Sequence, residues 1–371
     1  MHVLHVIDGL GLGGAERMLV DIANRTVDDG HRVTVCVTRE NVALARELDS
    51  RIQLLLLHRR ARISPLALVR LARYIRAQRV DVIHVHLRSN LAFVLQLRLT
   101  YAISTPIVFH DHTSFIEVDP AIPAWFRIGR RHIDHYVGVY DDQIKWAHRA
   151  GVDPRRTSVI PNGVDLSRFR SAEVTNLREE VKVGDRLLAV LVASLRPEKT
   201  IELLLQALKR SSARDRLVVA IIGPDGVPDY AKSCRALATE LGLDGVVIFA
   251  GARTDIPRLL PAADLGLLTS SIESGPLALI EYLAAGLPIV STRVGDVGRR
   301  LADHGVPGFV APADVEAFAH ELDIFVALTQ AQRRARAELG REILRERWDI
   351  RVAMPRWYAA YRGVMSAHAG A

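Results

Sequence analysis

The alternation of short apolar runs with longer amphipathic segments is the feature that most restricts how this chain can fold. Continuous runs of Val, Ile and Leu are typical of parallel strands that are buried on both faces. Helices between such strands supply the right-handed crossovers that a parallel sheet needs. A first series of strands is expected at Val3–Ile7, Arg32–Thr38, Ile52–Leu57, Val82–Val85, Ile107–Phe109, Tyr136–Val139 and Ser158–Ile160. A second series is expected at Leu187–Val192, Leu217–Ile222, Val246–Phe249, Leu265–Leu268 and Pro288–Ser291.

The turn-rich segment Pro161–Asp165 separates the two series of strands. With 371 residues the chain has the length of about two domains, so we expect two doubly wound, Rossmann-like α/β domains over residues 1–165 and 166–349. A closing helix over about 350–366 is expected to pack back on the first domain. The stretch Trp348–Met365 carries its apolar residues at near-helical spacing, and they are Trp348, Val352, Trp357, Tyr358 and Tyr361. A ligand is expected between the domains, at the carboxyl ends of the strands.

Composition excludes several classes of protein. Apolar residues make up 49% of the chain and charged residues 25%, which excludes a disordered or fibrous chain. Cys36 and Cys234 are too few and too far apart for a disulfide framework or a thiolate metal site. The first residues lead directly into an expected strand, and no apolar run approaches the roughly 20 residues of a spanning helix. We therefore expect a cytoplasmic protein, and leave open a peripheral location on the inner face of the cell membrane.

A glycine-rich turn follows the first expected strand. Residues 9–14 match G-x-G-x-x-G between a strand and a helix, which is the fingerprint of dinucleotide-binding proteins. In an NAD(P) dehydrogenase, Glu40 would hold a ribose hydroxyl, or Arg39 a 2′-phosphate. A glycine-rich turn ahead of a helix can bind any diphosphate, because backbone N–H groups and the helix dipole both favour the anion. The motif therefore predicts a phosphate-binding neighbourhood, and a dehydrogenase is the less favoured interpretation.

A second motif, residues 270–281, carries two carboxylates eight residues apart. Glu273 lies in an expected loop and Glu281 in the helix that this loop opens. Pro276 suits the first position of that helix, and the backbone N–H groups that follow would point at a ligand. The neighbours of Glu281 are almost all apolar, so an unpaired carboxylate there would be costly. Both carboxylates are therefore expected to accept hydrogen bonds from sugar hydroxyls.

The run Ser270–Thr292 resembles the signature of glycosyltransferase family four, whose members are retaining enzymes of the GT-B fold that use nucleotide-sugar donors. Further pieces follow in the family's order: Gly13–Arg17, Asp81–His86, Pro161–Asp165, Leu195–Lys199, Ile222–Gly226, Phe249–Gly251, Ala263–Asp264 and Gly308–Pro312. The resemblance covers nearly the whole chain. It implies an acceptor-side first domain and a donor-binding second domain that face each other across a cleft.

The implied reaction moves a sugar from a nucleotide diphosphate to an acceptor hydroxyl with retention of configuration. It would serve bacterial glycan, glycolipid or glycosylated natural-product synthesis. The resemblance implies no cofactor, since the nucleotide sugar is a substrate, and a UDP- or GDP-sugar is expected. The acceptor is a glycan, a lipid-linked molecule or a small molecule, and the sequence does not distinguish these.

The resemblance also implies roles for individual residues. Lys199, one of only five lysines in the chain, would balance the charge that develops on the leaving diphosphate. Glu273 would contact the transferred sugar, and His112 would reach that sugar near the bond that breaks. Glu281 would hold the ribose hydroxyls, and backbone groups near Gly251 would face the nucleobase. The full implied donor-binding set is Gly13, Gly14, Ser194, Arg196, Lys199, Gly251, Arg253, Glu273, Ser274, Gly275, Pro276, Leu277, Ala278 and Glu281.

Two departures from the family pattern concern the donor site. The family usually has Gly-Arg where this chain has Ala193-Ser194, and that arginine pairs with the phosphates. Arg196 can replace it, because alternate residues of an extended segment share a face, and we leave this hypothesis open. Where the family often has Gly-Gly, this chain has Gly295-Asp296. These departures leave the sugar of the donor undefined.

Two histidine pairs lie at ends of expected strands. His84 and His86, like His110 and His112, have i, i+2 spacing, so each pair points to one face, and four imidazoles could converge on zinc. Neither pair has the Glu or Asp spacing of a known metal hydrolase. We therefore expect no metal, and we interpret His84, His86 and His110 as packing or hydrogen-bonding groups.

Residues 51–98 contain ten arginines and one acidic residue, Asp81. Arg70, Arg73 and Arg76 share a face of the helix expected over Pro65–Gln78. This face is either a solvated basic surface or a surface for an anionic membrane or a lipid-diphosphate acceptor. Nucleic acid is not expected as a partner, because no aromatic residue is interleaved with this run until Tyr74 and Phe93, and no reader motif occurs.

Two other classes of function stay open. A nucleotide-sugar epimerase with a similar two-domain plan would consume the donor without an acceptor and would release no nucleotide diphosphate. A non-catalytic nucleotide-sugar-binding protein is suggested by Ser194 and Arg299, which replace expected donor contacts.

Overall fold

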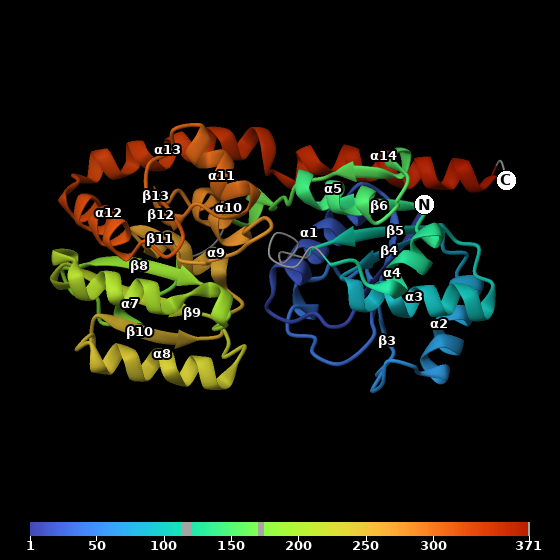
Figure 1. Cartoon of the computed structure of the whole chain (residues 1–371), viewed down its shortest axis with the longest axis horizontal. Coiled ribbons are helices and arrows are strands. Elements are labelled where there is room, and N and C mark those ends of the chain that lie inside the picture. Colours follow the sequence, from blue (N-terminus) through green and yellow to red (C-terminus); the bar gives the residue numbers. More distant parts are fainter. Residues whose placement is uncertain (113–120, 170–173, 370–371) are drawn as a thin grey trace. The chain divides into compact units, whose positions relative to one another are not determined.

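The computed structural model describes residues 1–112, 121–169 and 174–369 (Figure 1). The chain divides into two compact units. The first comprises Met1–Gly163 and Ile350–Ala371, and the second comprises Val164–Asp349. The division falls two residues before the boundary expected after residue 165. Both units are doubly wound and Rossmann-like, so the expected α/β fold class is confirmed.

Within the described residues, the first unit contains a parallel sheet of seven strands in the order β3-β2-β1-β4-β5-β6-β7. The strands are β1 (His2–Ile7), β2 (Arg32–Val37), β3 (Gln53–Leu56), β4 (Val82–His86), β5 (Ile107–Asp111), β6 (His135–Gly138) and β7 (Thr157–Val159). Each lies within two residues of its expected bounds. The agreement follows from the burial of the central strands, which demands the continuous apolar runs read in the sequence.

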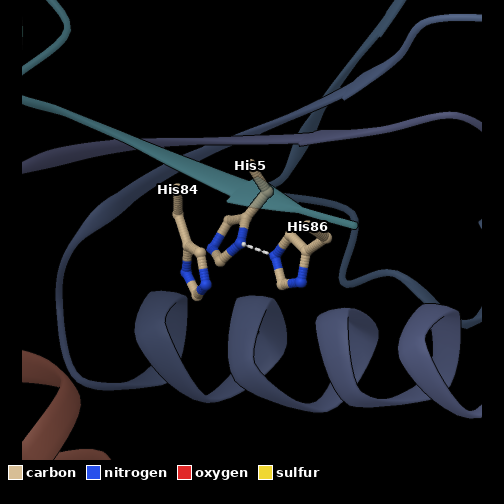
Figure 2. Close-up of side chains that lie close together, drawn as sticks. All are labelled: His5, His84 and His86. Carbon is tan, nitrogen blue, oxygen red and sulfur yellow. Dashed lines mark hydrogen bonds between the residues drawn. The ribbon is translucent and has the colours of Figure 1, made fainter. Parts of the chain in front are cut away.

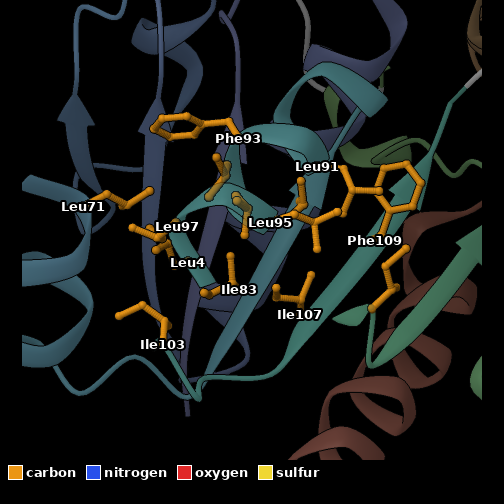
Figure 3. Close-up of a cluster of buried hydrophobic side chains, with 14 of the residues drawn as sticks. Leu4, Leu71, Ile83, Leu91, Phe93, Leu95, Leu97, Ile103, Ile107 and Phe109 are labelled. Carbon is orange, nitrogen blue, oxygen red and sulfur yellow. The ribbon is translucent and has the colours of Figure 1, made fainter. Parts of the chain in front are cut away.

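Helices cover both faces of this sheet. They are α1 (Gly14–Asp28), α2 (Pro65–Ala77), α3 (Arg88–Tyr101), α4 (Ala124–Gly129), α5 (Asp141–Arg149) and α14 (Ile350–Ala369). Figure 3 shows Leu91 and Leu95 of α3 beside Ile83 and Ile107 of the sheet, in one buried apolar cluster. Helix α1 packs its own apolar residues against β1 and β2 in a second cluster. The sheet is therefore closed to solvent on both faces, and its strand ends are left to carry polar groups.

The last helix, α14, returns the chain to the first unit, where it contacts α1 and β5. Trp357 and Tyr361 are fully buried, and the Tyr358 hydroxyl donates to Asp29 Oδ2 at 2.6 Å. The expectation that Val352 packs in the core is wrong, because its side chain is 38% exposed. Buried positions of α14 recur at i, i+3, i+4 and i+7 from Ile350, and Val352 falls outside that stripe.

The second unit contains, within the described residues, a parallel sheet of six strands in the order β10-β9-β8-β11-β12-β13. The strands are β8 (Leu187–Val192), β9 (Leu217–Ile222), β10 (Val247–Gly251), β11 (Leu265–Leu268), β12 (Ile289–Thr292) and β13 (Phe309–Val310). Only β13 was not expected, because a strand of two residues carries no periodic pattern. The helices are α6 (Leu177–Glu180), α7 (Ile201–Arg210), α8 (Pro228–Glu240), α9 (Ile256–Leu259), α10 (Leu277–Ala284), α11 (Gly295–Asp303), α12 (Val315–Ala327) and α13 (Gln330–Arg347).

Each sheet has one point where the chain changes its direction of winding, and we call this point the switch point of the sheet. In the first unit this point lies between β1 and β4, and in the second unit between β8 and β11. Ligands of doubly wound folds bind outside the carboxyl ends of the strands at such a point. The loops after β1, β4, β8 and β11 are therefore the positions where the fold itself favours a binding site.

The helices and the two cysteines bear on the environment in which the protein works. Among the described residues, no helix has both the length and the apolar character needed to cross a membrane. Cys36 and Cys234 are buried, free thiols that lie in different units. Burial raises the pKa of the Cys36 thiol, so this residue behaves as a small apolar side chain.

We predict that Trp357→Ala lowers the free energy of unfolding by about 3–5 kcal/mol, because it empties a fully buried position between α14 and the sheet. Denaturant unfolding followed by circular dichroism measures the change. Trp125→Ala is the matched control, since the Trp125 side chain is 38% exposed. Equal losses in the two variants would show that α14 does not contribute to the core of the first unit.

Candidate functional site

The switch point of the second unit brings a lysine and a glutamate together. Lys199 ends a short 3-10 turn, Pro197–Lys199, that follows β8, and Glu273 lies in the loop after β11. Lys199 Nζ is 2.5 Å from Glu273 Oε1, and the two side chains are 22% and 13% exposed. Ser270 Oγ donates to the same carboxylate oxygen at 2.8 Å. Two of the three expected catalytic residues are thus in direct contact.

Backbone contacts hold these two loops together. Thr269 Oγ1 donates to the carbonyl oxygen of Lys199 at 2.7 Å, and the Ser271 N–H donates to that of Glu198 at 2.9 Å. Thr200, next to Lys199, has a φ of 45°, a left-handed conformation that costs about 1–3 kcal/mol in a non-glycine residue. Such strain persists only where the surrounding contacts fix the backbone. The position of Lys199 is therefore set by the second loop as well as by its own.

Ser194 and Arg196 lie against one glycine in the neighbouring loop, which follows β9. A Cβ placed on Gly226 would be 2.2 Å from Ser194 Oγ and 2.7 Å from Arg196 Nε. The two side chains therefore share a side of the extended segment, as the alternation argument requires. Closer to the strands, a Cβ on Gly223 would be 1.9 Å from the carbonyl oxygen of Ala193. The two loops thus pack backbone against backbone.

Helix α10 carries the second carboxylate of the motif. The expectation that Pro276 is the first helical residue is wrong by one position: Pro276 is the N-cap, with a ψ of 108°, and the helix begins at Leu277. The first N–H groups of any helix, here those of Leu277 and Ala278, have no acceptor within it. Glu281 is buried, and Arg168 Nη1 lies 3.9 Å from its Oε1. Sequence reasoning missed Arg168, whose one signal is a basic residue shortly after the turn that joins the units.

The departure at Gly295-Asp296 has a structural explanation. Gly295 has a φ of +65°, and a Cβ there would lie 2.8 Å from Pro276 Cδ and 2.9 Å from the carbonyl oxygen of Ser274. The Asp296 N–H donates to that same carbonyl at 2.8 Å, so α11 holds the loop that contains Ser274 and the following Gly275. Arg300 Nε donates to both carboxylate oxygens of Asp296 at 2.8 Å. The acidic residue is therefore paired within its own helix.

The expected nucleobase contacts lie at the end of β10. Gly251 has a φ of 72°, and its carbonyl oxygen accepts from the Gly223 N–H at 2.8 Å. The guanidinium of Arg253 contacts Asp255 at 2.8 Å and Glu180 at 2.7 Å, and these carboxylates raise its pKa. Two carboxylates hold the Arg253 side chain. The backbone groups of residues 251–253 therefore fit the expected contact with a nucleobase better than this side chain does.

In the first unit, the glycine-rich turn packs against the loop after β2. The Leu10 N–H donates to the carbonyl oxygen of Asn41 at 2.7 Å, and a Cβ on Gly9 would be 2.9 Å from that of Glu40. Gly13 is the N-cap of α1, and Gly14 is the first residue of this helix. The Glu40 side chain is exposed. Gly9 thus allows the turn to pack closely against the loop after β2. The N-terminus of α1 lies at the switch point of the first sheet.

A polar network at the same strand ends was missed in the sequence. Asp8 follows β1, and its Oδ1 accepts from Thr38 Oγ1 at 2.8 Å and from Arg59 Nη2 at 2.7 Å. Its Oδ2 accepts from Ser89 Oγ at 2.5 Å. Burial acts to raise the pKa of Asp8, but these hydrogen bonds outweigh it and the pKa is lowered. Only the tertiary structure joins these residues, which come from four separate segments.

The third expected catalytic residue, His112, directly follows β5. Its Nε2 lies 3.3 Å from Nδ1 of His86, and burial lowers its pKa to about 4. His112 is therefore a neutral hydrogen-bonding group near pH 7. It also belongs to a set of neighbouring rings, which we call the five-histidine cluster: His5, His84, His86, His110 and His112.

Register explains how the five-histidine cluster forms. His5 of β1 pairs with His84 of β4, and His86 of β4 pairs with His110 of β5, so all four side chains leave one face of the sheet. His84 Nδ1 is 2.7 Å from the Tyr361 hydroxyl of α14. The sequence pattern identified the two pairs on β4 and β5. It did not include His5, because one histidine in an apolar strand has no partner within its own segment.

Two parallel sheets with these switch points, and a basic and an acidic residue in contact at one of them, define a doubly wound α/β protein with a candidate site at the strand ends. Residues 12–168 match the family model described as Glycosyltransferase Family 4, and residues 174–342 match the model described as Glycosyl transferases group 1. Together the two matches span most of both units. The chain belongs to glycosyltransferase family four and has the GT-B fold.

Individual relatives match over parts of their length. A D-inositol 3-phosphate glycosyltransferase of Geodermatophilus obscurus is 32% identical over 212 residues, which is 51% of this chain and 42% of that enzyme. An N-acetyl-alpha-D-glucosaminyl L-malate synthase of Bacillus anthracis is 23% identical over 246 residues, 65% of this chain and 64% of that enzyme. The matched part of this chain therefore spans less than two thirds of either relative.

A solved structure matches over the whole chain. The crystal structure of Anabaena Alr3699/HepE in complex with UDP and glucose has a TM-score of 0.82 and 22% sequence identity to this chain. The match covers 98% of this chain and 100% of that protein. At this identity the similarity establishes the fold.

We predict that Gly223→Ala destabilises the second unit by about 1–3 kcal/mol, because the new methyl group meets the backbone of Ala193 and no side chain can move aside. Thermal unfolding measures the loss. Gly363→Ala in α14 is the control, since its Cβ meets nothing within 4 Å and the substitution favours a helix. Unchanged stability in Gly223→Ala would contradict the close packing of the two loops.

Proposed function

We propose that this protein transfers a sugar from a nucleotide diphosphate to an acceptor hydroxyl with retention of configuration. The contact between Lys199 and Glu273 at the switch point of the second unit carries the proposal. A cation suits the leaving diphosphate, and a carboxylate suits the hydroxyls of a sugar. In this proposal the second unit binds the donor and the first unit receives the acceptor.

The proposed chemistry follows from the charges of this pair. The donor diphosphate competes with Glu273 for Lys199 Nζ, so the carboxylate becomes available to the sugar. As the bond between the sugar and the diphosphate breaks, Lys199 stabilises the negative charge that develops on the leaving group. The acceptor oxygen forms its bond to the sugar on the face that the diphosphate leaves, and the hydroxyl proton passes to the departing diphosphate oxygen. The nucleotide sugar is a substrate, and this scheme requires no cofactor and names no protein nucleophile.

Other groups of the second unit fit the rest of a donor. The N-terminus of α10, at Leu277 and Ala278, favours an anion through its N–H groups and its dipole. Arg196, exposed beside Ser194, is our proposed replacement for the arginine that the family usually places in front of the phosphates. Glu281 is proposed to hold the ribose, with Arg168 setting its position. Backbone groups of 251–253 are proposed to face the base.

The first unit supplies three further proposed contacts. The N–H groups of Gly13 and Gly14, at the start of α1, suit a phosphate oxygen for the same electrostatic reason. His112 is proposed to contact the transferred sugar. A neutral imidazole can donate one hydrogen bond and accept another, which suits a sugar hydroxyl better than a cation would.

The comparisons suggest which substrates to test first. The similar fold of Alr3699/HepE was solved with UDP and glucose, so UDP-glucose is the first donor, with GDP-sugars next. D-inositol 3-phosphate glycosyltransferase and N-acetyl-alpha-D-glucosaminyl L-malate synthase are similar in sequence, so small hydroxylated acids and phosphates are the first acceptors. Glycans and lipid-linked acceptors complete the proposed range.

We predict that Lys199→Ala and Glu273→Gln each lower kcat by on the order of 10²-fold or more, because each removes stabilisation that is greatest in the transition state. Arg196→Ala is expected to raise the KM for the donor more than it lowers kcat. The assay measures release of nucleotide diphosphate from UDP-, GDP-, ADP- and dTDP-sugars, with and without acceptors.

Lys209→Ala and Glu240→Gln are the matched controls, since both side chains are exposed and lie outside the site. Near-normal turnover in Lys199→Ala or Glu273→Gln would overturn the assignment of the site. Conversion of the donor without acceptor or diphosphate release would identify an epimerase. Donor binding with no turnover across the panel would identify a binding protein.

We also propose that α2 contacts an anionic membrane surface. Arg70, Arg73 and Arg76 are exposed on α2, opposite its buried face. Beside them Ile63 and Leu66 are 69% and 72% exposed, and this combination of basic and apolar groups suits the interface of a lipid bilayer. The available charge is smaller than the sequence count suggests. Four arginines of residues 51–98 pair with carboxylates: Arg51, Arg59, Arg88 and Arg98.

We predict that the triple variant Arg70→Ala, Arg73→Ala, Arg76→Ala loses co-sedimentation with anionic vesicles at low salt, because each basic residue near such a surface contributes about 1 kcal/mol. Vesicles without anionic lipid are the control for the wild type. A matched protein control is Arg334→Ala, an exposed arginine of α13 in the second unit. Equal sedimentation of wild type and triple variant would refute the membrane contact.

A further inference from the structure

Three histidines of the five-histidine cluster present ring nitrogens to one another. They are His5 of β1 and His84 and His86 of β4 (Figure 2). One nitrogen of each lies within 4.8 Å of the others, and all three residues are fully buried. His5 Nδ1 is already 3.0 Å from His86 Nε2. Three imidazoles thus converge on one point inside the first unit.

Several of these nitrogens lack the hydrogen bonds that buried polar atoms normally have. Within the described residues, Nε2 of His5, Nε2 of His84 and both ring nitrogens of His110 are buried without a partner. Native proteins leave few buried polar atoms unpaired, and each such atom calls for an explanation. Core packing does not explain these histidines. An apolar side chain would fill the same space without the free-energy cost of burying unpaired nitrogen atoms.

We propose that His5, His84 and His86 bind one divalent transition-metal ion of the zinc class, as a structural site between the sheet and its covering helices. Neutral imidazole is a ligand that Zn²⁺ and its neighbours in the first transition row prefer. The ion takes up the lone pair of His84 Nε2, which is otherwise unpaired, whereas His110 lies outside the proposed set. It also joins β1 to β4, the two strands at the switch point of the first unit.

The surroundings fit such a site. Zinc–nitrogen bonds of about 2.0–2.1 Å place the ligand nitrogens of a tetrahedral ion roughly 3.3 Å apart. In the structure His5 Nδ1 and His86 Nε2 are 3.0 Å apart and all three ligand nitrogens lie within 4.8 Å of one another, so the rings must move to close around an ion. Metal-bound histidines usually have a partner on the second ring nitrogen. Here His84 Nδ1 is 2.7 Å from the Tyr361 hydroxyl, and His86 Nδ1 is 3.3 Å from His112 Nε2.

A second set of converging nitrogens, from His86, His110 and His112, overlaps the first. We favour the first set for two reasons. All its members are fully buried, whereas His112 is partly exposed and is the residue that our functional proposal gives to the sugar. The first set also has an outer hydroxyl partner, that of Tyr361. The proposed site needs no ligand atom from His112, although His86 contacts that residue through its second ring nitrogen.

The test uses the full-length, tag-free chain after treatment with a chelator. Co²⁺ is titrated in, the absorption of tetrahedral cobalt is recorded, and Zn²⁺ is then added to displace it. We expect one ion per chain and a rise in melting temperature on adding Zn²⁺. His5→Gln and His84→Gln should each abolish stoichiometric binding, and Tyr361→Phe should weaken it by about 10–100-fold.

Two further variants distinguish loss of a metal ligand from poor folding of the glutamine variants. His84→Cys retains a zinc ligand and should add a thiolate-to-cobalt charge-transfer band. His110→Gln removes a neighbouring buried imidazole outside the proposed set and should leave binding intact. No stoichiometric binding by the wild type would overturn the proposal. So would binding that survives His5→Gln and His84→Gln, or that is lost in His110→Gln alone.

Discussion

The burial of two parallel sheets on both faces is the constraint on which the rest of this structure depends. Once helices cover both faces, a polar side chain can meet a substrate that arrives from solvent only where strands end. The change of winding between β1 and β4, and between β8 and β11, then opens a gap between successive loops. The fold thus fixes where chemistry can occur before any particular side chain is considered.

Within the second unit, glycines and backbone hydrogen bonds convert that general location into a defined geometry. Gly223 lets the loop after β9 touch the backbone of Ala193, and Gly295 lets α11 hold the loop after β11. Lys199 and Glu273 therefore approach each other from loops whose backbones are already fixed. In our proposal, an arriving diphosphate changes the contacts of this side-chain pair while the loops stay in place. This behaviour is what the proposed transfer of a sugar from a diphosphate requires.

The five-histidine cluster gathers five polar rings beside a buried sheet. Aligned register puts histidines of β1, β4 and β5 side by side, and α14 closes over them with Trp357 and Tyr361. Burial holds their pKa values low, to about 3 for His5 and about 4 for His112. The rings are therefore neutral near pH 7, and they retain lone pairs that an ordinary apolar core would not contain.

The sequence by itself determined the fold class, all described strands but β13, and the glycine-rich turns. Its resemblance to a family also predicted site roles for Lys199, Glu273 and Glu281, and these roles stay predictions. Strand and turn patterns are local, since burial and backbone conformation act on consecutive residues. Only the tertiary structure decided that Arg168 reaches Glu281, that Asp8 joins Thr38, and that His5 completes a histidine cluster. These contacts depend on strand order, register and the return of α14. Those features arise from packing between segments far apart in the chain, and no local pattern encodes them.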